Sequence, residues 1–151
     1  MKTAQKNLLI DAIALVVYLI VANPGLTGIA VHEWLSLGVV VVLFVHCVVH
    51  HDWVVEVIRK KRGKRTPSEV ANAVINLITL IILMIVVVSG LFISGTVLQV
   101  FGLYADGYFF WDPLHSVSAK VLLALLVVHV AMHAKWIYRF IRNGKGSTDD
   151  E

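Results

Sequence analysis

Six of the seven histidines in this 151-residue chain form two copies of one spacing pattern. In each copy a second histidine follows the first after fourteen residues, a third follows four residues later, and a tryptophan follows three residues after that. The copies are offset by 83 residues and consist of His32, His46, His50 and Trp53, and of His115, His129, His133 and Trp136. Imidazoles bind haem iron and zinc, so the repeated pattern predicts a metal centre rather than isolated interhelical hydrogen bonds.

The spacing places histidines on one helix face at two levels. Fourteen residues are about 3.9 helical turns, so His32 and His46 share a face and lie roughly 21 Å apart along the axis. His115 and His129 have the same relation. If the two segments run in the same direction, His32 faces His115 and His46 faces His129. Each level then offers two imidazoles to one iron, which predicts two bis-histidine haems in a helical bundle.

The rest of the chain predicts a membrane protein that would hold these levels in place. It is 58% hydrophobic, 15% charged and has a mean hydropathy of +0.82, values unusual for a soluble domain. Four stretches, 7–22, 29–58, 69–93 and 114–141, are long enough to cross roughly 30 Å of hydrocarbon. We therefore predict an all-α, four-helix transmembrane bundle over residues 1–143, with a short disordered tail at 144–151.

Turn and cap residues predict where these helices begin and end. The Asn23-Pro24-Gly25 turn should end the first helix, and the Thr66-Pro67-Ser68-Glu69 segment should open the third. Asp112 should cap the last helix, with Pro113 in its first turn. The N-terminal stretch shows no small-residue cleavage site, which predicts a retained helix rather than a signal peptide.

The basic residues predict the orientation. Twelve of the thirteen Lys and Arg lie at the N-terminus, in the 59–65 segment or from Lys135 onward. By the positive-inside rule both termini and the middle loop are cytoplasmic, in a multi-pass protein of the inner membrane. The pI of about 9.1 is therefore a topology signal, and no basic face of a nucleic-acid-binding domain is present.

The type of haem follows from the cysteine content. Cys47 is the only cysteine, and the chain has no Cys-x-x-Cys-His motif. Covalent c-type attachment is therefore excluded. The expected cofactor is haem b, held by coordination alone.

Spacing alone does not decide which histidines would bind the inner haem, the one nearer the predicted cytoplasmic side. His50 and His133 lie eighteen residues, or five full turns, from the first histidines and keep the same face even better. We favour His46 and His129, because the alternative separates the levels by roughly 27 Å, nearly the whole hydrocarbon thickness. His50 and His133 then contact the ligands or the haem propionates.

Other polar and small residues have two interpretations each. Gly38 would leave room for a macrocycle or would mediate helix packing. Lys120, the only basic residue of the outer half, would pair with an outer propionate or extend to the interface. Asp11 with Asn72 and Asn76 would form a pocket that accepts a proton from a quinol, or would form interhelical hydrogen bonds with one another.

The segments from His32-Glu33-Trp34 to Trp53 and from His115 to Trp136, with the segment from Ile75-Asn76-Leu77 to Ser89-Gly90 between them, resemble a known family. They are similar, over nearly the whole chain, to the small four-helix di-haem cytochromes b called flavinylation-associated cytochromes. The resemblance implies an electron-carrying subunit of a membrane oxidoreductase that serves a flavoprotein, iron–sulfur or multihaem partner and uses quinone or that partner as donor or acceptor. It also implies haem b ligands at His32, His46, His115 and His129, with His50 and His133 as accompanying positions.

Two rival functions use the same residues differently. The two His-x3-His pairs, His46 with His50 and His129 with His133, could form a tetrahedral zinc site in a metal-binding or transport protein. That leaves His32 and His115 unexplained. A bare membrane anchor explains the four helices but not the duplicated spacing.

Overall fold

The computed structural model describes residues 3–59 and 66–143, and these residues form helices and no strand. The basic residues at 60–65 and the expected tail at 144–151 lie outside the described residues, as does the side chain of Trp53. The four long helices are α1 (Thr3–Val21), α3 (Ile29–Val49), α5 (Pro67–Ile93) and α7 (Tyr108–Asn143). The short helices are α2 (Pro24–Thr27), α4 (His51–Arg59) and α6 (Val97–Val100).

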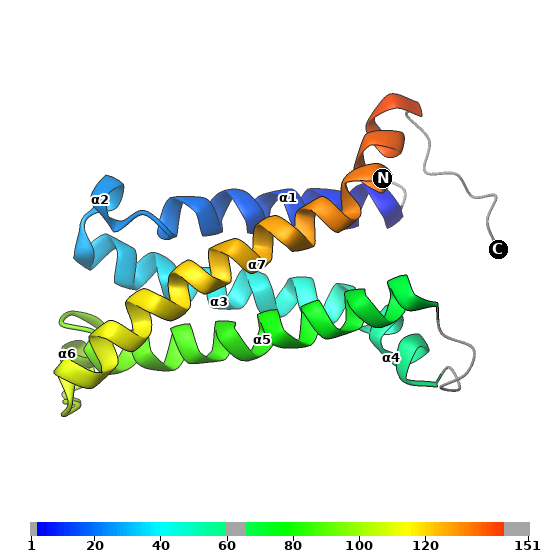
Figure 1. Cartoon of the computed structure of the whole chain (residues 1–151). Coiled ribbons are helices and arrows are strands. Elements are labelled where there is room, and N and C mark those ends of the chain that lie inside the picture. Colours follow the sequence, from blue (N-terminus) through cyan, green and yellow to red (C-terminus); the bar gives the residue numbers. More distant parts are fainter. Residues whose placement is uncertain (1–2, 60–65, 144–151) are drawn as a thin grey trace.

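The long helices form two antiparallel pairs. The main contacts join α1 to α3 and, more extensively, α5 to α7, whereas α3 and α5 touch much less. In Figure 1, α2 and α6 lie at one end of the bundle, and α4 lies at the other with the start of α1 and the end of α7. Because α5 runs antiparallel to α7 and returns the chain to the end where α3 begins, α3 and α7 run in the same direction.

Three of these helices are long and apolar enough to cross a membrane: Ile29–Val49, Pro67–Ile93 and Tyr108–Phe140. The fourth expected span, residues 7–22, falls in α1, which is not among the three spans found in the described part of the chain. Most large apolar side chains point outward; Phe44 is 68% exposed and Val127 is 64% exposed. Such faces match lipid surroundings rather than water.

Local sequence signals account for two helix boundaries, including the end of α1 at Val21 just before the Asn23-Pro24-Gly25 turn, and fail at two others. The predicted start of α5 is confirmed, because Thr66 and Glu69 form a reciprocal capping box. The predicted helix 29–58 is wrong: it breaks at His50, which ends α3 with its backbone N–H on the His46 carbonyl. The last helix begins at Tyr108, so Pro113 lies inside it.

The earlier start of α7 has a backbone cause. Gly107 has a φ of +89°, which glycine adopts without steric cost. Its carbonyl accepts the backbone N–H groups of Phe110 and Trp111. The helix therefore starts before Asp112 is reached, and Pro113 removes only one main-chain donor from the second turn.

A small apolar core lies at the middle of the bundle, between the two histidine levels. Tyr18 and Val21 of α1, Val39 of α3 and Leu122 of α7 are buried together. Side chains from α5 pack against this cluster: Ile82, Leu83 and Val86. All four long helices meet here, so this layer fixes how the histidine-bearing helices lie relative to each other.

Candidate functional site

The outer level brings His32 of α3 against His115 of α7. Their ring centroids are 6.3 Å apart, and the ring planes are 79° apart. The histidine spacing predicts this facing pair. The structure thus places two imidazoles from parallel helices opposite each other.

The separation of the rings fits one iron between them. An imidazole nitrogen binds a metal ion at about 2 Å, and the ring centre lies about 1 Å further out, so two rings on one iron have centroids roughly 6 Å apart. The 6.3 Å between His32 and His115 matches this value. Direct contact between the two rings would not by itself require that spacing.

Both outer histidines are oriented by backbone carbonyls of the neighbouring helix. The Nδ1–H of His32 donates to the carbonyl of Val21 at 2.8 Å, and that of His115 donates to the carbonyl of Val86 at 3.0 Å. A hydrogen bond at Nδ1 fixes the tautomer and leaves Nε2 as the metal-binding nitrogen. The outer pair therefore has the orientation that haem ligands need.

The inner histidines are oriented in the same way by side chains. The Nδ1–H of His46 donates to Asp11 Oδ1 at 2.9 Å, and that of His129 donates to Asn76 Oδ1 at 2.9 Å. Helix α1 thus supplies both acceptors for α3, and α5 supplies both for α7. Within the described residues, no hydrogen bond occupies Nε2 of any of the four histidines.

The third histidines of the repeat differ from the second. His50 uses its Nε2 to donate to the same Asp11 oxygen, at 3.0 Å, and its ring centroid is 4.8 Å from that of His46. The rings of His129 and His133 are 5.0 Å apart. The Nε2 of His50 is therefore engaged with Asp11, whereas the Nε2 of His46 has no hydrogen bond.

Comparison with known proteins gives the family. The model of the prokaryotic cytochrome b561 family matches residues 4–141. The chain belongs to this family. No curated protein and no solved structure gives a match. Cytochromes b561 are membrane proteins that bind haem b and transfer electrons, so the predictions of a membrane cytochrome b, of haem b and of an integral membrane protein are confirmed at that level.

This b561 cytochrome also has close packing at the outer level that the sequence analysis missed. A Cβ atom on Gly90 of α5 would lie 3.0 Å from Cε1 and 3.2 Å from Nδ1 of His115. Ser89, which is fully buried, places its Oγ 3.4 Å from the same Nδ1. A glycine in an apolar helix was the available signal, but the sequence does not say which side chain it faces.

Two residues proposed to contact haem have open surroundings. A Cβ atom on Gly38 would meet nothing within 4 Å, so the protein itself does not need a glycine there for helix packing. Lys120 is exposed and forms no ion pair within the described residues. Both arrangements leave these positions free for a bound group or for lipid.

The expected hydrogen bonding between Asp11 and the asparagines is wrong. Asp11 bonds to His46 and His50 instead. Asn76 accepts from His129, and the buried Oδ1 of Asn72 has no hydrogen-bond partner. The reason is geometric: α1 lies along α3, so its carboxylate meets the histidines of α3 before it can reach α5.

Glu33, next to His32, connects α3 to the segment between α5 and α7. Its carboxylate accepts from the side chain of Ser94 at 2.7 Å and from the backbone N–H groups of Gly95 at 3.0 Å and Thr96 at 2.8 Å. The hydroxyl of Thr96 and the backbone N–H of Val97 complete the set. This carboxylate is therefore occupied by structural hydrogen bonds and fixes the outer end of α3.

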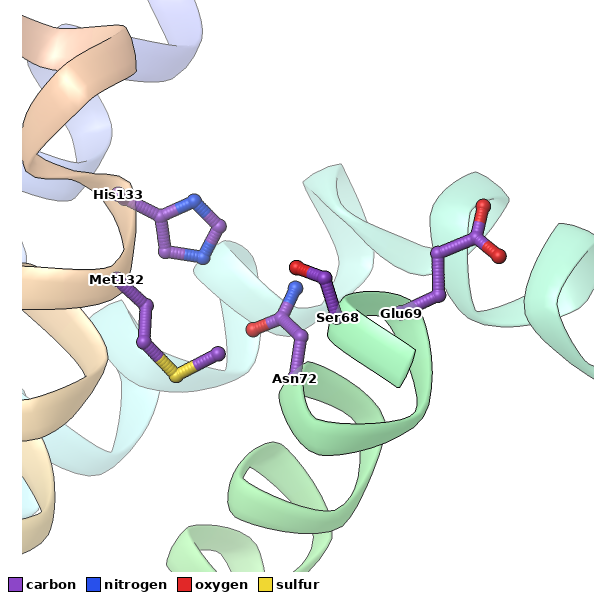
Figure 2. A pocket seen from close by; sticks show the side chains of 5 residues that line it. All are labelled: Ser68, Glu69, Asn72, Met132 and His133. Carbon is purple, nitrogen blue, oxygen red and sulfur yellow. The ribbon is translucent and has the colours of Figure 1, made fainter. Parts of the chain in front are cut away.

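A polar pocket of about 210 Å³ lies at the inner end of α5 and α7, lined by Ser68, Glu69, Asn72, Met132 and His133. Figure 2 shows His133 and Met132 on one side and Ser68 and Asn72 on the other. Asn72, whose buried Oδ1 has no hydrogen-bond partner, is one of the residues that line this pocket. The lining therefore offers polar groups from α5 and α7 to a ligand.

Proposed function

We propose that this protein is a di-haem cytochrome b that moves electrons across the membrane as a subunit of a larger oxidoreductase. His32 and His115 would bind the outer haem b, and His46 and His129 the inner one. The observation that carries this proposal is the shared orientation of the four histidines. Each donates from Nδ1 to an acceptor on α1 or α5, which is the arrangement expected of metal-binding imidazoles.

The residues of the chain would position the haem ligands and exclude water from the space between the haems. Bound haems supply one-electron oxidation and reduction. The acceptors on α1 and α5 hold the imidazoles, and the buried cluster around Leu122 keeps water out of the space between the levels. Gly38 would lie against a macrocycle, and Lys120 would neutralise an outer propionate, consistent with the open surroundings of both.

We also propose that α1 is a fourth transmembrane helix, with both termini cytoplasmic in the inner membrane. Support comes from the position of α1 along α3 and from the basic residues that gather at one end of the bundle. The start of α1 and the end of α7 lie at that end (Figure 1). Charge bias of this kind determines orientation.

The electron partners are proposed from the resemblance and from the polar pocket. A flavoprotein, iron–sulfur or multihaem protein would exchange electrons at one side, and quinone or quinol would do so from the lipid. The pocket beside His133 supports the second route, because Ser68, Asn72 and His133 in its lining can form hydrogen bonds with a quinol head group. Its volume of about 210 Å³ suits a ring rather than a whole isoprenoid quinone.

A visible spectrum of the purified protein in mild detergent tests the proposal. We expect a reduced-minus-oxidised alpha band of low-spin haem b and about two haems per chain by pyridine haemochrome assay. One haem per chain would refute the two-level arrangement. A colourless protein, after expression with ample haem, would refute haem binding altogether.

A second candidate has one observation in its favour. Ligand atoms of Asp11, His46 and His50 lie within 4.8 Å of one another, a group that could hold a divalent metal such as zinc. Stoichiometric zinc without a Soret band would support this metal-binding function. Equilibrium dialysis with zinc, followed by elemental analysis, decides between the two.

A further inference from the structure

One of the four oriented histidines donates to a charged group. Asp11 Oδ1 accepts from His46 Nδ1 at 2.9 Å and from His50 Nε2 at 3.0 Å. A carboxylate that accepts two N–H groups is held in its ionised, acceptor-only form. The exposed fractions of the Asp11 and His46 side chains are 33% and 27%, so water reaches the pair only in part.

The other three histidines donate to neutral acceptors. His32 and His115 use the carbonyls of Val21 and Val86, and His129 uses the amide of Asn76. The four histidines therefore donate from the same nitrogen, Nδ1, but only the acceptor of His46 is charged. The acceptor positions repeat at an offset of 65 residues, Val21 with Val86 and Asp11 with Asn76, so the asymmetry lies in one residue type: a carboxylate in the first copy and an amide in the second.

The charge has a defined consequence for an iron centre. A carboxylate on the distal nitrogen of a ligating imidazole makes that imidazole more basic. A negative charge nearby also favours the ferric form, which carries one more positive charge than the ferrous form. Both effects lower the reduction potential, since second partners of the ligands and local charge set haem potentials.

We infer that Asp11 is a positioning residue that makes the inner haem harder to reduce than the outer haem. His50 holds the carboxylate in place by donating from Nε2 to the same Oδ1 that accepts from His46. Electrons that enter at the inner level would then move to the outer haem, the centre of higher potential. This inference rests on the proposed di-haem function and adds a direction to it.

Spectroelectrochemical titration of the full-length protein at one fixed pH tests the inference. Asp11→Asn keeps an oxygen that can accept from both histidines and removes the charge. We expect the lower of the two potentials to rise, by about tenfold in the ratio of oxidised to reduced haem, or about 59 mV for a one-electron couple. The higher potential should stay unchanged.

A second variant, Asn76→Asp, keeps the inference testable if Asp11→Asn loses its inner haem. Asn76→Asp places a carboxylate on His129 of the same level and should lower the same potential. His115→Ala, which removes an outer ligand, identifies which potential belongs to the inner haem. If Asp11→Asn loses the inner haem, an unchanged inner potential in Asn76→Asp overturns the inference.

The remaining outcomes are also decisive. Two haems with unshifted potentials in Asp11→Asn, or a shift confined to the outer haem, would overturn the role of Asp11 and leave the proposed function standing. A wild-type protein without haem would overturn the proposed function itself. Haem content and potential are measured separately, so the two failures cannot be confused.

Discussion

Val39 on α3 and Leu122 on α7 occupy equivalent places in the repeat. Each lies seven residues after one histidine of its helix and seven before the next. Val39 is 6% exposed and Leu122 is 2% exposed, and both belong to the same buried cluster. The repeat thus includes the apolar layer between the two histidine levels, and this layer is where the two helices are held in register.

Replacing Leu122 with Ala should destabilise the bundle by about 2 to 5 kcal/mol, because it removes buried methyl groups and leaves a cavity. The free energy of unfolding in detergent, followed by circular dichroism, measures this. Leu123→Ala is the matched control, since Leu123 is 40% exposed. Equal effects of the two variants would contradict the central role of this layer.

Gly90→Ala should disturb the outer level alone. The added Cβ would lie 3.0 Å from Cε1 of His115, tighter than most Cβ contacts in proteins, so the imidazole must shift by a few tenths of an ångström. We expect partial or complete loss of one haem per chain, measured by pyridine haemochrome assay. Gly95→Ala, whose Cβ meets nothing within 4 Å, should keep both. Retention of two haems in Gly90→Ala would show that the close approach of Gly90 to His115 does not constrain the outer haem.

Glu33→Gln should lower the stability of the outer end of α3. The carboxylate accepts from five donors, and an amide can accept with only one of its two terminal atoms. Each buried donor left without a partner costs about 1 to 3 kcal/mol. The thermal midpoint and protease cleavage within residues 94–107 measure the effect. Glu56→Gln, at an exposed position on α4, should change neither.

His46→Ala and His50→Ala should differ, although the two residues are one turn apart. We expect His46→Ala to lose the inner haem and to keep the outer one. His50→Ala should retain two haems, because the Nε2 of His50 is engaged with Asp11 rather than free. The alpha-band spectrum and haem content separate the two results, and the reverse pattern would show that His50 is the inner ligand.

Local signals in the sequence predicted the parts of the fold that depend on local chemistry. The capping box of Thr66 and Glu69 is a contact between residues three apart, so sequence spacing alone reveals it. The facing of His32 and His115 follows from helical periodicity combined with chain direction. The break at His50 carries no glycine or proline, and the helix boundary there was missed for that reason.

The acceptors of the histidines could not be predicted. Val21 and Val86 act through backbone carbonyls, which every residue has, so no residue type marks them. Asp11 and Asn76 are visible as polar residues in apolar helices, but which histidine each meets depends on how the helices pair. The pairing of α1 with α3 and of α5 with α7 is a property of packing across the whole bundle.

The helices bury few side chains against one another, and this affects how stable the protein is in the cell without haem. Six apolar residues form the buried core of the described chain, too few to hold two loosely joined hairpins firmly. Bound haem would then stabilise the packing of the helices in addition to transferring electrons. A cell starved of porphyrin should therefore degrade the newly inserted polypeptide, and its abundance should follow the supply of that pigment.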